Sequence, residues 1–122
     1  MESAMEKFTF CKTRIEKSEM TSGDKFRITL TTNKGIRKRT FIFNDNYLNN
    51  SSKEEIMRCL VDDFYIVDNY YGNIKSFMRD YGYEDIHRAN EVFNLCHQNH
   101  RNLALVLGRK IIEQLREELK DY

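Results

Sequence analysis

The apolar residues of this chain change their spacing about two-fifths of the way along the sequence. In the first part they recur at every second position, as at Phe26, Ile28 and Leu30, and the alternation resumes beyond a polar, glycine-ended turn at residues 33–35. Strands with one buried face show this alternation, and a short turn of that kind joins the strands of a hairpin. We therefore expect residues 1–47 to be a β-rich segment, an antiparallel meander of about three strands.

In the second part the apolar residues take the spacing of a helix. Two serines followed by two glutamates at residues 51–55 form a capping box, which predicts the start of a helix. Apolar residues then recur three and four positions apart, with interruptions at residues 71–73, at Gly82 and at Gly108. The segment 51–122 is therefore expected to contain three to four helices.

Strands followed by helices predict an α+β fold, in which the three to four helices pack on the N-terminal meander. The chain of 122 residues, 40% hydrophobic and 32% charged, suits one folded domain spanning residues 1–122. No apolar run approaches the ~18 residues that a membrane-spanning helix needs, and no signal peptide is recognisable. We expect a cytoplasmic protein that does not bind membranes and is a monomer or a homodimer.

The three cysteines are expected to be either buried thiols or metal ligands, because the cytosol keeps thiols reduced. Cys96 and His100 are four residues apart, a spacing at which one helix can supply two ligands to a tetrahedral zinc ion. With Cys11 and Cys59 they would form a closed, structural Cys₃His zinc site. Against this site, no CxxC or HxxxH pair is present, and unliganded cysteine is commonly buried.

Charged residues suggest two different interaction surfaces. Basic residues of the predicted hairpin could track a phosphate backbone, or could protect an exposed sheet from edge pairing. They are Lys25, Arg27, Lys34, Arg37, Lys38 and Arg39. Acidic residues of the helical part could dock on a basic partner surface, or could be the solvated sides of amphipathic helices. They are Asp62, Asp63, Asp68, Asp80, Glu84 and Asp85.

No recognisable catalytic motif or phosphate-binding glycine loop occurs in the sequence. Adjacent acids such as Asp62 and Asp63 point in different directions on a helix, unlike two carboxylates that grip one substrate. We therefore expect a protein that is not an enzyme.

A stretch of the helical part combines an aromatic–acidic helix, a glycine-tyrosine turn and a downstream cysteine. Its residues are Cys59, Leu60, Asp63, Ile74, Phe77, Asp80-Tyr81-Gly82-Tyr83-Glu84, Ala89, Phe93 and Cys96. This combination resembles a family of small proteins from phages and mobile elements of Gram-positive bacteria. The sequence departs from the family pattern at Ile74, where an aromatic residue is usual, and after Glu84, where the loop is one residue short.

The resemblance implies a non-enzymatic inhibitor of host defence. The first hypothesis is an anti-CRISPR protein that binds the type II effector Cas9, or its guide complex, and blocks target DNA loading or activation. The alternative is a small nucleic-acid-binding regulator of a phage or mobile element, which would use the basic hairpin.

Overall fold

The computed structural model describes residues 13–17, 26–32, 37–43 and 51–120 of the chain. Within the strands, it describes the side chains of Thr29 and of residues 39–43. In chain order the elements are β1 (Thr13–Lys17), β2 (Phe26–Thr32), β3 (Arg37–Phe43), α1 (Lys53–Tyr70), α2 (Ile74–Tyr81), α3 (Ile86–Leu107) and α4 (Arg109–Leu119).

The strands pair in the order β1-β2-β3, and both pairs are antiparallel. Phe26 of β2 lies opposite Phe43 of β3. Because side chains alternate between the two faces of a strand, Arg39, Phe41 and Phe43 share one face of β3. Phe41 and Phe43 are buried in the core, so this face is directed toward the helices.

The helix ends follow signals that are legible in the sequence. The Ser52 hydroxyl accepts a hydrogen bond from the Glu55 backbone N–H at 3.1 Å, and the Glu55 carboxylate accepts one from the Ser52 N–H at 3.3 Å. This confirms the capping box at the start of α1. Gly82 ends α2 with φ of 77°, and Gly108 separates α3 from α4 with φ of 84°. Both angles lie in the left-handed range that favours glycine.

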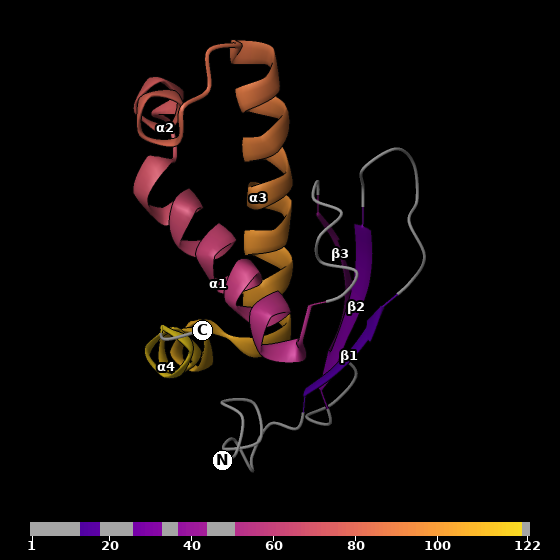
Figure 1. The fold of residues 1–122 in the computed structure, drawn as a ribbon. Coiled ribbons are helices and arrows are strands. Elements are labelled where there is room, and N and C mark those ends of the chain that lie inside the picture. Colours follow the sequence, from indigo (N-terminus) through magenta and orange to yellow (C-terminus); the bar gives the residue numbers. More distant parts are fainter. Residues whose placement is uncertain (1–12, 18–25, 33–36, 44–50, 121–122) are drawn as a thin grey trace.

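Three of the four helices build most of the core. As Figure 1 shows, α3 lies between α1 and the sheet. Helix α4 packs against the middle of α1, with Arg109 over the ring of Phe64 and Arg116 over that of Tyr65. The buried apolar side chains of these elements form one cluster, to which the sheet adds two phenylalanines. Its members are Phe41, Phe43, Ile56, Met57, Leu60, Val61, Phe64, Leu103, Val106, Leu107, Ile112, Leu115 and Leu119.

A three-stranded antiparallel sheet and four helices occur in the expected order, but the expected α+β architecture, in which the helices pack on the N-terminal meander, is wrong. Helices make up 78% of the residues whose side chains are described. Of the helices, α3 lies along the sheet, whereas α2 and α4 pack chiefly on α1 and α3. The reason is that the apolar stripes of α1 and α4 belong to one core cluster, in which Phe64 of α1 and Leu115 of α4 are both buried. Within the described residues, no helix has the length and apolarity needed to cross a membrane.

The shortest helix, α2, is held at the far end of α1 and α3 by aromatic side chains. Phe77 is buried and contacts the rings of Tyr81, Tyr83 and Phe93 at centroid distances of 5.1 to 5.4 Å. The Tyr70 hydroxyl of α1 donates a hydrogen bond to Asp80 of α2 at 2.7 Å. The glycine-tyrosine turn therefore has a packing role in this fold.

Candidate functional site

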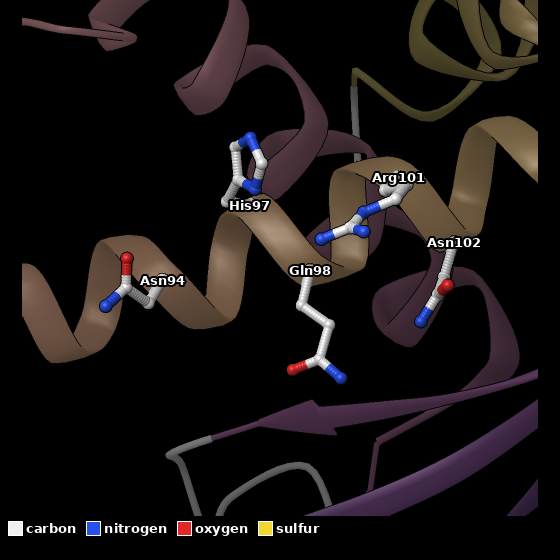
Figure 2. A pocket seen from close by; sticks show the side chains of 5 residues that line it. All are labelled: Asn94, His97, Gln98, Arg101 and Asn102. Carbon is white, nitrogen blue, oxygen red and sulfur yellow. The ribbon is translucent and has the colours of Figure 1, made fainter.

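A groove of about 400 Å³ runs along the exposed side of α3, beside the sheet (Figure 2). Five polar side chains line it, and they follow one another at the three- and four-residue spacing of a single helix face. They are Asn94, His97, Gln98, Arg101 and Asn102. In Figure 2, the side chain of Gln98 points from the helix toward the strands. The groove therefore lies along the boundary between α3 and the sheet.

Among the described residues that line it, the groove presents hydrogen-bond donors and no carboxylate. The sequence has no acidic residue from Val92 to Ile112, and none of the five lining residues is acidic. Amide groups both donate and accept hydrogen bonds, whereas the guanidinium of Arg101 only donates and is always charged. The lining therefore suits an anionic ligand with many acceptor oxygens.

The strand β3 extends this donor-rich region. Asn99 donates a hydrogen bond to the Ile42 carbonyl oxygen at 3.3 Å, and Asn102 donates one to the Thr40 carbonyl oxygen at 3.5 Å. The helix and the strand therefore run in opposite directions here: Asn99 lies beside Ile42, and Asn102, further along α3, lies beside the earlier residue Thr40. The next residue of β3 is Arg39, which is exposed. It lies toward the Asn102 end of the groove, on the helix-facing side of the strand.

At the groove's other side, planar rings stack in a series from solvent into the core. The rings of Tyr71 and His97 have centroids 5.7 Å apart and planes inclined by 25°. The rings of His97 and His100 have centroids 6.4 Å apart and planes inclined by 12°. The rings of His100 and Phe64 have centroids 4.1 Å apart and planes inclined by 9°. Tyr71 is 72% exposed, whereas Phe64 is buried. His97 therefore connects the groove to a supported stack of rings.

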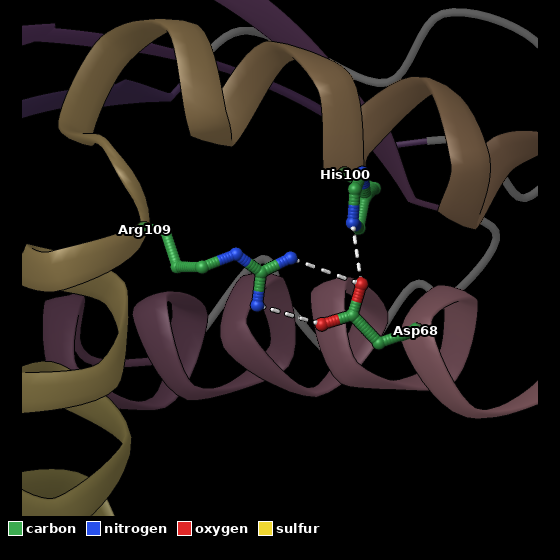
Figure 3. Close-up of polar contacts among 3 residues, drawn as sticks. All are labelled: Asp68, His100 and Arg109. Carbon is green, nitrogen blue, oxygen red and sulfur yellow. Dashed lines mark hydrogen bonds and ion pairs between the residues drawn. The ribbon is translucent and has the colours of Figure 1, made fainter.

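His100 is also hydrogen-bonded, in a cluster that joins three helices (Figure 3). Its Nε2 lies 3.0 Å from Asp68 Oδ1, and the Arg109 guanidinium donates to both oxygens of Asp68 at 2.9 and 3.2 Å. The hydrogen bonds from Arg109 hold the pKa of Asp68 below its usual value, against a smaller effect of burial. The cluster links α1, α3 and the first residue of α4.

A second polar cluster is buried between α1 and α3. Asp63 accepts hydrogen bonds from Cys96 Sγ at 3.5 Å and from Asn99 Nδ2 at 3.1 Å. Burial raises the pKa of Asp63 to about 6, although both hydrogen bonds act in the opposite direction. Burial, with the neighbouring Asp63 carboxylate, also raises the pKa of the Cys96 thiol. This cluster links the helices to β3 through the bond from Asn99 to Ile42.

The structure gives two of the four predicted zinc ligands other partners. Cys96 bonds to Asp63, and His100 bonds to Asp68. Cys59 is half-buried, and Cys11 lies outside the described residues. Among the described side chains, no three His, Cys, Asp or Glu residues are grouped to hold a metal ion. Zinc at this site stays a prediction, which elemental analysis of protein purified without a His-tag can test.

The predicted acidic docking residues do not share one surface. Asp63 faces α3, Asp68 is bonded to His100 and Arg109, and Asp80 is bonded to Tyr70 and Arg79. Asp62 lies 3.9 Å from Arg58, Glu84 lies in the turn after α2, and Asp85 caps α3. All of the six except Asp63 are exposed. Asp63, Asp68 and Asp80 are each bonded to a side chain of another helix.

The predicted basic residues are only partly described. Lys25 and Lys34 lie outside the described residues, and Arg27 lies on β2 and Arg37 and Lys38 on β3 without a described side chain. Arg39 is the member of the set whose exposed side chain can be placed.

Sequence reasoning missed the groove residues Asn94, Gln98, Arg101 and Asn102. The available signal was their shared helix face, together with the long interval without an acidic residue. Comparison with protein-family models, curated proteins and solved structures gives no match.

Proposed function

We propose that this chain is a nucleic-acid-binding protein that holds a sugar–phosphate backbone along the groove of α3. The observation that carries the proposal is the described lining of that groove, which consists of donor side chains and a guanidinium without a carboxylate. Phosphate oxygens are anionic acceptors, and contacts to them from Arg, Asn, Gln and His side chains position a nucleic acid without reading its sequence.

Charge supports the same proposal on a larger scale. Arg101 lies within the groove, and exposed Arg39 extends the region along β3. A backbone that follows α3 toward Arg39 would meet a positive side chain at both places. Since the whole chain has a net charge of only +1, binding would depend on this local arrangement.

The proposal can be tested by fluorescence anisotropy with labelled random DNA and RNA oligonucleotides over a range of salt concentrations. Arg101→Gln should weaken binding to all sequences to a similar degree and make the salt dependence less steep by about one unit of slope, as for the loss of one phosphate contact. The matched control is Arg88→Gln, which makes the same change on α3 in an ion pair with Glu91, outside the groove. Absence of binding, or equal weakening by both variants, would contradict the proposal.

The Cas9-inhibitor hypothesis stays a prediction that depends on the family resemblance alone. Three of its six predicted acidic contacts, Asp63, Asp68 and Asp80, are already bonded to side chains of other helices, which gives it less support than the groove gives nucleic-acid binding. Co-purification from a host that carries a CRISPR system tests it directly. Recovery of an effector, with no binding of free nucleic acid, would favour the inhibitor.

A further inference from the structure

We infer that the ligand of the α3 groove is single-stranded nucleic acid, with one base stacked on the ring of Tyr71. This inference rests on the proposed nucleic-acid binding and adds the class of ligand. It follows from the position of an exposed aromatic ring next to a phosphate-binding lining.

Tyr71 is placed for this role by the end of α1. It is the C-cap residue of that helix, and its backbone N–H is bonded to the Val67 carbonyl oxygen at 2.9 Å. The ring stacks on His97, which itself lines the groove. With 72% of Tyr71 exposed, its ring keeps surface available for a second planar group.

The rings behind Tyr71 support it. His97 stacks on His100, and His100 stacks on the buried ring of Phe64 and bonds to Asp68. A planar group held in place from one side loses little conformational entropy when a base stacks on its other side. Stacking of this kind accepts any base, because every base has a π-face.

Single strands fit this arrangement better than duplexes do. In a duplex the faces of the bases are covered by their neighbours, so that an aromatic side chain beside the backbone finds no free base. A helix that reads duplex DNA protrudes into the major groove, whereas the lining residues of α3 border a hollow beside the sheet. Donors along a groove with an aromatic ring at its side are the combination by which proteins hold single strands.

The test compares single-stranded and duplex oligonucleotides of one length by fluorescence anisotropy, with the wild-type chain and two Tyr71 variants. The wild type should prefer the single strand. Tyr71→Ala should weaken single-strand binding by roughly fivefold or more and leave duplex binding nearly unchanged. Tyr71→Phe keeps the ring and should bind as the wild type does.

The matched control is Tyr81→Ala, which removes another half-exposed tyrosine ring, packed on Phe77 and away from the groove. Melting curves by circular dichroism establish that each variant is folded. If Arg101→Gln weakens binding but Tyr71→Ala does not, the groove binds nucleic acid without stacking and this inference fails alone. If the wild type binds neither form, the proposed function fails as well.

Discussion

The imidazole of His100 lies nearly parallel to the ring of Phe64, with centroids 4.1 Å apart and an angle of 9° between the planes. The guanidinium of Arg109 lies 4.8 Å from the centroid of the same ring. The imidazole of His100 and the guanidinium of Arg109 also both bond to Asp68. One phenylalanine and one carboxylate of α1 therefore fix the positions of α3 and α4.

The Asp68 cluster should contribute measurably to stability. Asp68→Asn removes the carboxylate that bonds to both Arg109 and His100 and should lower the free energy of unfolding, because α3 and α4 lose their shared partner on α1. Urea denaturation at pH 7 measures this loss. Glu91→Gln breaks a more exposed pair with Arg88 and should change stability by less than about 0.5 kcal/mol. Equal effects of the two substitutions would contradict the assigned role of Asp68.

Asp63 should make stability depend on pH between about 4 and 7. Its pKa in the folded chain is raised to about 6 from 3.8, so the folded state binds a proton more readily than the unfolded state does. The contribution of Asp63 to stability is therefore present at low pH and is lost as the pH rises through 6. Urea midpoints at pH 5 and pH 7 should differ less in Asp63→Asn than in the wild type. An unchanged difference would show that Asp63 titrates normally.

Asn99 should be among the costliest polar residues to replace. It is 2% exposed and donates to both Asp63 and the Ile42 carbonyl oxygen. Asn99→Ala leaves a buried carboxylate with one donor fewer, which should cost about 2 kcal/mol of unfolding free energy. Asn102→Ala removes a longer bond to Thr40 from a more exposed position and serves as the comparison. Thermal unfolding followed by circular dichroism measures both losses. A larger loss for Asn102→Ala than for Asn99→Ala would contradict the role given to Asn99.

Gly82 should be required for its backbone conformation rather than for space. A Cβ atom built at this position meets nothing within 4 Å, but φ is 77°. Gly82→Ala should therefore destabilise the chain by about 1 kcal/mol through backbone strain, and Gly82→Asn by less, because asparagine tolerates the left-handed region. Chemical denaturation of the two variants measures both values. Equal losses would point to a contact of the new side chain instead.

Local features of the helical part could be predicted from the sequence because each depends on a few neighbouring residues. The capping box at Ser52, the glycine stop at Gly82 and the break at Gly108 are of this kind. The arrangement of the helices could not be predicted in this way. Helix α3 contacts both α1 and the sheet, and the spacing of its apolar residues does not show which neighbour lies on which side.

The candidate site was harder to predict than the fold. The sequence positions of the acidic residues do not distinguish Asp63, which accepts a hydrogen bond from Asn99 between α1 and α3, from Glu84, which is exposed. The groove residues Gln98 and Arg101 look like an ordinary solvated helix face until β3 is placed beside them. Their significance arises from a neighbour more than fifty residues away, as the bond from Asn102 to Thr40 illustrates.

The two asparagine bonds to β3 also bear on how the protein avoids self-association. In the sheet order β1-β2-β3, β3 is an outer strand, and an outer strand with unoccupied backbone groups is a template on which other chains can add strands. The carbonyl oxygens of Thr40 and Ile42 already accept hydrogen bonds from α3. The helix thereby covers part of the edge at which aggregation would begin, so Asn99 in the core and Asn102 in the groove both limit the pairing of β3 with a strand of another chain.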